Sequence, residues 1–216
     1  MTKIFYLILF TLCCYACNQL QSASNIFTEN NENSNLQTDS IHYHQLYIKA
    51  NEAKIFCQEN NYNTDYCLLI NLSKHSGKKR FYLWDFEKGK AIDSGMVSHG
   101  CFDNSWGQTS TKEKASCSNV ENSHASSLGN YKIGERGVSE WGIKVKYTLY
   151  GLDKTNSNAY KRIIVLHSWN MVSEDEVYPD GTPEGWGCPA TSDEFLTRID
   201  KKLRTSKRPV LLKIFQ

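Results

Sequence analysis

One cysteine and one histidine are spaced in a way that suits nucleophilic catalysis. His167 ends the apolar run 163–167, and Cys188 follows one loop later in the turn 185–189, where Gly187 precedes it and a proline follows it. Glycine permits a tight turn, and proline stiffens the exit. A thiolate is the attacking form of cysteine, and a nearby imidazole can take up its proton. The pair therefore predicts a thiol nucleophile with its general base.

A simpler interpretation is that Cys188 is half of a disulfide and that His167 is a core histidine, and these two residues alone favour it. The cysteines after Cys17 are Cys57, Cys67, Cys101, Cys117 and Cys188. In an oxidising compartment this odd number predicts two disulfides and one free thiol. Local spacing favours Cys57–Cys67 and Cys101–Cys117, which leaves Cys188 reduced, although the connectivity stays open.

Other kinds of site are disfavoured. No Cys-x-x-Cys motif follows the N-terminal apolar run, and His99, His124 and His167 are scattered, so no metal site is expected. The net charge of +2 demands no polyanion, and no glycine-rich phosphate loop is present, so neither nucleic acid nor a cofactor is expected. The basic residues after 197 are interpreted as a solvated helix face, and attraction to an anionic cell wall or membrane surface is the alternative.

The N-terminus predicts export. Lys3 precedes the apolar run 4–16, which is too short to span a bilayer and typical of a secretory signal. Cys17 follows Ala16 and is a candidate for lipid modification, which we favour over ordinary cleavage. We assign residues 1–17 to a signal peptide with a possible lipobox. We assign residues 18–42 to a tether that is too polar to pack.

Residues 43–216 are predicted to form one β-rich domain. It begins with an amphipathic helix at 44–58. A capping box of Thr191 and Glu194 predicts a second helix with Phe195, Ile199 and Leu203 on one face. Strands are expected at 67–72, 80–86, 91–98, 130–133, 143–149, 163–167 and 210–215. The fold class is therefore mainly β with flanking helices (α+β), with a long loop over 100–127.

Two features would tune the predicted pair. Cys188 lies just before the second helix, whose N-terminal partial charge would favour a thiolate if the turn points the sulfur that way. His167 needs an orienting partner, and the main-chain carbonyl of Ser168 is one candidate. Acidic side chains of the intervening loop are others, namely Glu174, Asp175, Glu176 and Asp180.

Six blocks of the chain resemble one family. They are 63–67, 76–81, 126–131, 156–162, 165–168 and 185–189. The pattern resembles the L,D-transpeptidases of bacterial cell walls, which have the YkuD-like fold, and is most similar to the divergent murein L,D-transpeptidase catalytic domain family. The resemblance implies a YkuD-like β-sandwich or barrel-like domain.

The resemblance also implies roles for individual residues. Cys188 would be the nucleophile, and His167 its base and later its acid. The Ser168 carbonyl would orient the imidazole, and N–H groups near Gly187 and Cys188 would form the oxyanion hole. Expected substrate contacts are Ser123, His124, Ser126, Ser127, Tyr131, Arg136, Arg162 and Trp186. Many family members have Ser/Thr-His where this chain has Gly185-Trp186, and a polar residue where it has Ala190, so their carboxylate contacts do not carry over.

The implied reaction is acyl transfer on peptidoglycan stem peptides, through a thioester on Cys188 that forms as a D-residue leaves. An amine from a second stem or from an anchored protein would give a cross-link, whereas water would give L,D-carboxypeptidase activity. A non-catalytic wall-binding module that uses Trp141, Trp169 and Trp186 is the alternative. The expected location is the bacterial periplasm or cell envelope, with membrane contact only through the lipid anchor.

Overall fold

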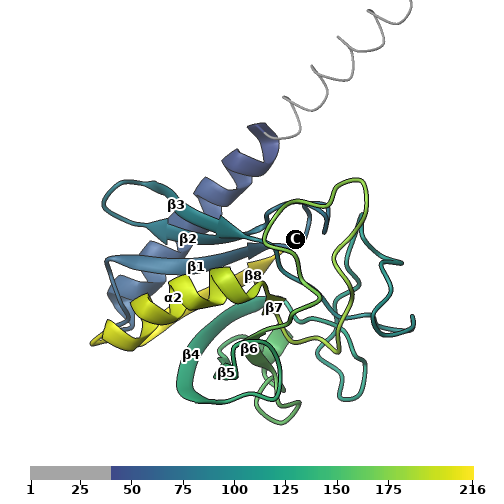
Figure 1. Cartoon of the computed structure of the whole chain (residues 1–216). Helices are drawn as coiled ribbons and strands as arrows, with labels where there is room; N and C mark the ends of the chain where they lie inside the picture. Colours follow the sequence, from purple (N-terminus) through teal and green to yellow (C-terminus); the bar gives the residue numbers. More distant parts are fainter. Residues whose placement is uncertain (1–39) are drawn as a thin grey trace, which may run out of the picture. The chain divides into compact units, whose positions relative to one another are not determined.

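The computed structural model describes residues 40–216, and its larger compact unit comprises Gln45–Gln216. This unit is built on an eight-stranded sheet with the order β3-β2-β1-β8-β4-β5-β6-β7 (Figure 1). The strands are β1 (Tyr66–Asn71), β2 (Phe81–Asp85), β3 (Lys90–Gly95), β4 (Gly129–Val138), β5 (Val145–Gly151), β6 (Val165–Ser168), β7 (Ala190–Thr191) and β8 (Val210–Phe215). The predicted strands are all present, and β7 is an addition.

The sheet curls until its two ends meet. Val97, just after β3, forms an isolated antiparallel bridge with Thr191 of β7. The N–H of Ser98 also donates to the carbonyl of Ala190, at 2.8 Å. Because these contacts pair part of both sheet edges, fewer backbone N–H and C=O groups are left without a hydrogen bond. The predicted mainly β, barrel-like fold with flanking helices is confirmed.

Two neighbouring strands, β1 and β8, are buried on both faces. They pair in parallel, with Leu68 opposite Leu212 and Ile70 opposite Ile214. Because side chains alternate along a strand, Leu68 and Ile70 enter the main core while Leu69 enters a second cluster. Burial on both faces explains why these two segments are nearly continuous apolar runs.

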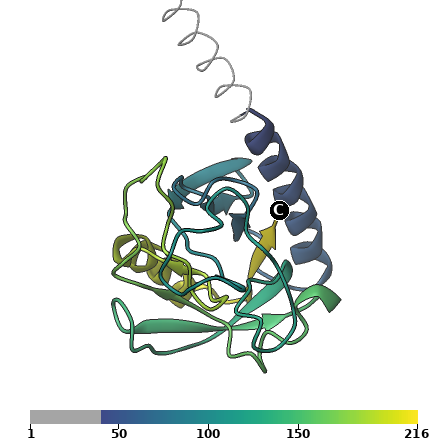
Figure 2. The same cartoon turned by 90° about the vertical axis from the view of Figure 1, so that its right-hand side faces the viewer.

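Residues 40–59 are helical, where the sequence predicted 44–58. Residues 40–42 were assigned to the polar tether, and this is corrected, because polar side chains do not stop a helix from continuing. From residue 45 on, the helix packs Leu46, Ala50 and Ala53 into the second cluster, together with Leu69. Figure 2 shows this part of the helix alongside β8, the C-terminal strand. Packing of this apolar stripe stabilises the helix more than its propensity does.

Helix α2 (Asp193–Thr205) has its N-cap one residue later than the sequence predicted. Its N-cap is Ser192, whose Oγ accepts a hydrogen bond from the Phe195 N–H at 3.2 Å. The capping box on Thr191 is therefore wrong. Thr191 belongs to β7, and its hydroxyl donates to the carbonyl of Met96 at 2.6 Å. Phe195, on the apolar face of α2, lies in the main core, as expected.

The two predicted disulfides are not present, and all five described cysteines are free thiols. Cys57 and Cys67 both lie in the second cluster, where burial raises the pKa of Cys57 to about 12. Such thiols pack as small apolar groups. Cys117 packs against the main core, and Cys101 lies outside that cluster. Spacing along the chain did not reveal that Cys101 and Cys117 pack in different environments.

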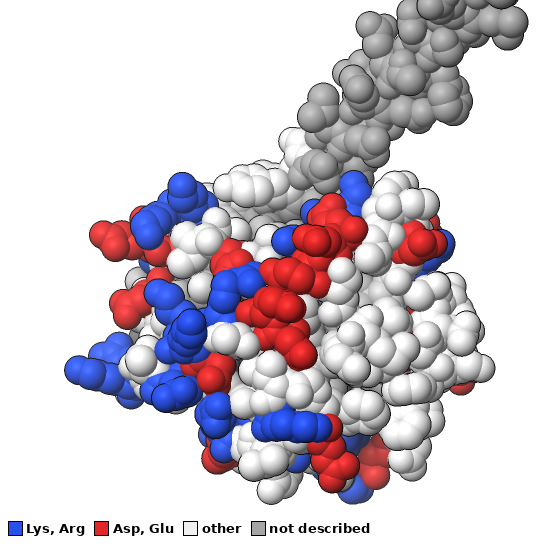
Figure 3. All heavy atoms as spheres, viewed as in Figure 1, with Lys and Arg blue, Asp and Glu red and all other residues white. Residues whose placement is uncertain are grey.

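The signal peptide, the lipidated Cys17 and tether residues 18–39 lie outside the described residues. None of the helices within the described part of the chain combines the length and apolar character needed to cross a bilayer. Lysines and arginines gather in Figure 3 on the side where α2 ends. A broad area without charged side chains covers the loops on the opposite side of the same view.

Candidate active site

Cys188 and His167 line the same pocket, which has a volume of about 370 Å³. This size lies within the usual range for small-molecule sites. The remaining lining is mostly aromatic and carries no carboxylate or ammonium group. The lining residues are Trp106, Trp141, His167, Trp169, Gly185, Trp186, Cys188 and Ala190. The structure thus brings the predicted nucleophile and base together.

His167 is held by the sheet and by its own main chain. It pairs with Lys146 of β5 and with Ala190 of β7, so strands flank it on both sides. Its Nδ1 lies 2.9 Å from the Ser168 main-chain oxygen. The Ser168 hydroxyl in turn accepts a hydrogen bond from the Ile143 N–H at 3.0 Å. Burial lowers the pKa of His167, and Lys146 lowers it further, against the opposing effect of the Ser168 carbonyl. The imidazole is therefore neutral near pH 7.

The sulfur of Cys188 contacts the start of β6. Its Sγ accepts a hydrogen bond from the Val165 N–H at 3.4 Å and lies 3.7 Å from the Ile163 carbonyl oxygen. Burial raises the pKa of the Cys188 thiol, although the Val165 N–H, Arg162 and Lys146 oppose this rise. Along the chain, β7 lies between Cys188 and the first residue of α2. The pocket thus contains a neutral thiol and a neutral imidazole.

The turn before the cysteine requires glycine at position 187. Gly187 has φ +97°, a conformation that L side chains rarely adopt, and a Cβ there would overlap the Ala125 carbonyl. The Ser126 hydroxyl accepts from the Gly100 N–H at 3.1 Å and donates to the Gly187 carbonyl at 3.4 Å. Ser126 therefore links the turn before Cys188 to the backbone at Gly100.

Arg162 anchors residues 118–125, the segment that lies against the turn before Cys188. Its guanidinium donates to the Ser118 carbonyl at 2.9 Å and to the Ala125 carbonyl at 2.5 Å. It also reaches the Ser123 hydroxyl at 3.4 Å. The His124 ring stacks on Trp186 with centroids 5.5 Å apart. Arg162 is thus engaged by main-chain oxygens, while His124 supports a wall of the pocket.

Three predicted substrate contacts lie elsewhere. The Tyr131 hydroxyl is buried and donates to the Ser127 carbonyl at 2.7 Å, and its ring belongs to the main core. The Ser127 hydroxyl bonds the same phenol at 2.8 Å and is buried as well. Arg136 pairs with Asp200 of α2 at 2.8 Å. None of the three lines the pocket with Cys188, because core packing and an ion pair engage them instead. Of the eight predicted substrate contacts, Trp186 lines this pocket, whereas Ser123, His124, Ser126 and Arg162 do not.

The acidic loop does not orient the imidazole. Glu174 accepts a hydrogen bond from the Ser192 hydroxyl at 2.5 Å and pairs with Arg198 at 2.9 Å. Glu176 accepts from the Lys79 N–H at 2.8 Å. The Ser168 carbonyl is the orienting group that the structure contains, as the resemblance implied.

A buried polar network lies behind the cysteine turn and was missed by sequence reasoning. Arg80 donates to the Val97 carbonyl at 3.0 Å and lies 2.8 Å from Nδ1 of His99. His99 contacts the Thr111 hydroxyl at 2.8 Å, and Oε1 of Glu184 accepts from the Thr111 N–H at 2.6 Å. The other carboxylate oxygen of Glu184 is buried without a hydrogen-bond partner among the described residues.

This network is continuous with the segment that carries Cys188. Glu184 directly precedes Gly185, whose N–H donates to the His99 carbonyl at 2.8 Å, and the Cys101 N–H donates back to Gly185 at 2.7 Å. Burial and the adjacent Arg80 lower the pKa of His99 to about 3, so its ring is neutral. Trp106 and Lys146 are two further residues near the site that the sequence reasoning did not single out. The alternation of 143–149 could have indicated that Lys146 lies on the face of the strand opposite to the core.

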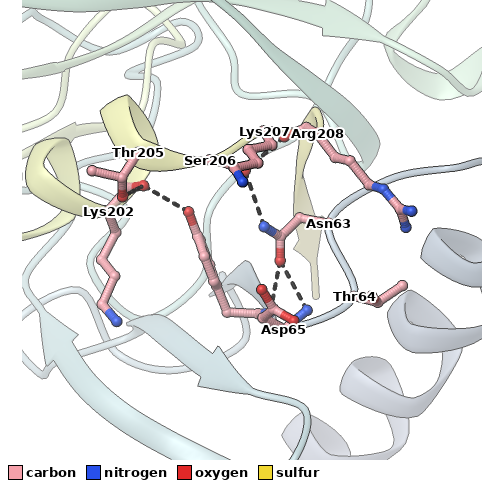
Figure 4. Close-up of a pocket in the computed structure, with 9 residues that line it drawn as sticks. Asn63, Thr64, Asp65, Lys202, Thr205, Ser206, Lys207 and Arg208 are labelled. Carbon is pink, nitrogen blue, oxygen red and sulfur yellow. Dashed lines mark hydrogen bonds between the residues drawn. The ribbon is translucent and has the colours of Figure 1, made fainter.

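A larger pocket, of about 640 Å³, lies where β1 begins and α2 ends (Figure 4). Asn63 organises it, because its amide donates to the Ser206 hydroxyl at 2.9 Å and its carbonyl oxygen accepts from the Asp65 and Tyr66 N–H groups. The Tyr66 hydroxyl donates to the Lys202 carbonyl at 2.8 Å. The lining of this pocket contains neither a cysteine nor a histidine, so the smaller pocket is the candidate active site. No cluster of three or more His, Cys, Asp or Glu within residues 40–216 is arranged to hold a metal ion.

Comparison with protein families gives one match. The model of the L,D-transpeptidase catalytic domain family, YkuD_2, matches residues 37–211. This range includes both His167 and Cys188 and covers most of the chain. No curated protein matches the chain.

Several solved structures have low similarity to this chain. Bd1075 of Bdellovibrio bacteriovorus has a TM-score of 0.44 at 12% identity, covering 72% of this chain and 49% of that protein. Pgp2, the helical cell shape determining protein of Campylobacter jejuni, has a TM-score of 0.42 at 12% identity, covering 72% and 49%. An L,D-transpeptidase of Xylanimonas cellulosilytica has 0.37 at 10%, covering 74% and 67%. The chain spans about half the length of the first two, and likenesses this weak support no conclusion about function.

Proposed function

Because the chain belongs to the L,D-transpeptidase catalytic domain family, we propose that it is a cysteine acyltransferase that acts on the stem peptides of peptidoglycan. One observation carries the proposal. The Nδ1 of His167 faces the Ser168 carbonyl in the pocket that Cys188 also lines. Since a carbonyl only accepts hydrogen bonds, Nδ1 carries the proton and Nε2 keeps its lone pair. His167 is thereby prepared to act as a base.

The proposed reaction has two halves. In the first, Nε2 of His167 takes the Cys188 proton while the sulfur attacks the carbonyl that joins an L-centre to the terminal D-residue. The C–N bond then breaks, and His167 returns the proton to the leaving amine, so a thioester and a free D-residue result. In the second half, an amine attacks the thioester and forms an amide, which regenerates the thiol.

The N–H groups of Gly187 and Cys188 suit the oxyanion that forms in between. Among the described residues neither N–H donates to a protein atom, and Ser126 holds the Gly187 carbonyl at 3.4 Å. Preorganised donors of this kind stabilise a tetrahedral intermediate because they need not reorient as charge develops. Positive φ at Gly187 is part of the geometry that presents them.

The acceptor sets the final activity. An amine from a second stem or from an anchored protein gives transpeptidation, and water gives L,D-carboxypeptidase activity. The family match and the predicted signal support a location in the bacterial periplasm or cell envelope, with Cys17 as the proposed lipid anchor. The half-exposed indoles also keep a non-catalytic wall-binding module as the second candidate.

Product analysis separates these functions. The protein is incubated with a stem tetrapeptide, with and without a second stem as amine donor, and the products are resolved by mass spectrometry. Cross-linked dimer with release of the D-residue supports transpeptidation, and a tripeptide alone supports carboxypeptidase activity. Cys188→Ala should form neither product. Binding of wall fragments without any product from the wild-type protein would favour the binding module.

A further inference from the structure

Four of the five tryptophans of this chain surround the pocket that contains Cys188. Trp106 lies at their centre, with ring centroids 5.0 Å from Trp169, 6.3 Å from Trp141 and 6.5 Å from Trp186. They come from three separate stretches of the chain. Trp106 belongs to the long loop, Trp141 to the turn before β5, and the other two to the connection between β6 and β7. The rest of this section calls them the four-tryptophan cluster.

Core packing explains one member of the cluster. Trp169 is buried with Met96 and Val172. Trp106, Trp141 and Trp186 are 43%, 48% and 62% exposed, although indoles are large apolar groups. A contiguous exposed apolar surface on a soluble domain marks a binding site more often than a structural need. The exposed indole faces are therefore available to a ligand.

The lining selects an uncharged ligand. It contains no lysine, arginine, aspartate or glutamate, and the Arg162 guanidinium is engaged by main-chain carbonyls. The carboxylates of a stem peptide have no cationic partner in this wall. A sugar ring is uncharged and presents a face of C–H groups, which suits the negative face of an indole, while its hydroxyls can accept from indole N–H groups.

The length of the stem between the scissile bond and the sugar is compatible with a sugar bound at the four-tryptophan cluster. In peptidoglycan the stem is joined to its sugar by an amide, so the disaccharide itself carries no carboxylate. The three stem residues that precede the scissile bond span at most about 10 Å when extended. Trp186 is two residues from Cys188, and its neighbour Trp106 lines the same pocket. A sugar attached to the acyl donor therefore remains within reach of the cluster.

We propose that the four-tryptophan cluster binds a sugar ring of the glycan strand to which the acyl-donor stem is attached. This inference rests on the proposed acyl transfer at Cys188 and adds a substrate class to it. The enzyme would act on stems still linked to glycan in preference to free peptides.

The test compares two donors with the same tetrapeptide, one linked to the N-acetylglucosamine–N-acetylmuramic acid disaccharide and one free. Wild-type kcat/KM should be roughly tenfold higher for the linked donor, mainly through KM, as expected for a stacked aromatic contact. Trp186→Ala should bring this ratio close to one, and Trp186→Phe should retain part of it. Tyr160→Ala is the matched control, because Tyr160 is an exposed aromatic that stacks on Tyr150 outside the pocket. It should keep the wild-type ratio.

A binding measurement separates this inference from the proposed function. Cys188→Ala is titrated with the disaccharide whose lactyl carboxyl is amidated, while tryptophan fluorescence is recorded. A saturable change that Trp186→Ala abolishes supports the subsite. Equal turnover of the two donors without disaccharide binding would overturn the subsite and leave acyl transfer intact. Disaccharide binding without turnover of either donor would overturn acyl transfer and retain the sugar site.

Discussion

The Nδ1 atom of His167 lies 2.9 Å from the main-chain oxygen of Ser168, its neighbour in β6. The partner of the base is thus part of the backbone, in a strand that is hydrogen-bonded on both sides. Substituting a side chain cannot remove it. The tautomer needed for catalysis is therefore a property of the sheet, and no carboxylate has to provide it.

Substitution of His167 should mainly slow acylation, whereas substitution of Ser168 should mainly lower the stability of the fold. His167→Gln removes the base and should slow acylation by ~10²-fold or more, with little loss of stability, because His167 is only partly buried. Ser168→Ala keeps the carbonyl, so acylation should stay within a few-fold of wild type. It leaves the Ile143 N–H unpaired, however, and should lower the free energy of unfolding by ~1–3 kcal/mol. Single-turnover kinetics and urea unfolding measure the two effects. A Ser168→Ala variant that is stable but inactive would argue against a main-chain partner.

The pH dependence follows from the two pKa shifts at the site. Burial raises the pKa of Cys188 above 9.0 and lowers that of His167 below 6.5, so thiol and imidazole are both neutral between these values. Without substrate, alkylation of Cys188 by iodoacetamide should rise about tenfold per pH unit from pH 7 to 9, since only the thiolate reacts. Acylation should fall only on the acid side, below pH 6.5, where His167 becomes protonated.

Lys146 provides the control for this pH profile. Its ammonium lowers the pKa of both Cys188 and His167, so Lys146→Met should move both midpoints to higher pH. Peptide mapping distinguishes Cys188 from the other four thiols of residues 40–216. Rapid alkylation of Cys188 at pH 6 would show a preformed thiolate–imidazolium pair and contradict this description.

Glu184 is expected to position the cysteine turn. Glu184→Ala removes the acceptor of the Thr111 N–H and should destabilise the fold by ~1–3 kcal/mol. It should also slow acylation, because Gly185 and the following turn lose a fixed neighbour. Glu184→Gln can keep that hydrogen bond and should restore much of the acylation rate at an unchanged pH profile. If Glu184→Gln shifted the acid limb instead, Glu184 would be acting on the ionisation of the pair.

His99 should make the fold sensitive to acid. Its pKa is lowered from 6.5 to about 3 by burial and by Arg80, so the unfolded chain binds this proton more readily. Stability from this group is present above pH 6.5 and is lost as the pH falls toward 3, by at most about 1.4 kcal/mol per pH unit. Urea unfolding of wild type and His99→Gln between pH 7 and 4 tests this. Equal slopes for the two proteins would rule out His99 as the source.

Local patterns predicted the elements that depend on local chemistry. The apolar runs of β1 and β8 and the stripe of the N-terminal helix follow directly from which faces are buried. Cys188 and His167 were found because glycines, a proline and an apolar strand flank them. In each case the informative residues lie within a few positions of one another.

The remaining features depend on contacts between distant segments. Tyr131 faces the core and not the cleft, which only the packing of β4 decides. Arg136 finds Asp200 on α2, and Glu184 finds the Thr111 N–H across the long loop. Trp106 lies in that loop without any periodicity to mark it. Cysteine spacing likewise could not show that Cys101 and Cys117 pack in different places.

The most direct test of the central claim is the mass of the intact protein after mixing with a stem tetrapeptide. Proposed acyl transfer through Cys188 predicts an adduct equal to the tripeptide acyl group, present within one turnover and mapped to Cys188 by peptide analysis. The adduct should be labile to hydroxylamine, as a thioester is, and should disappear when an amine acceptor is added. A D-residue released by the wild-type protein with no adduct at any stage, or an undiminished rate from Cys188→Ala, would contradict the account.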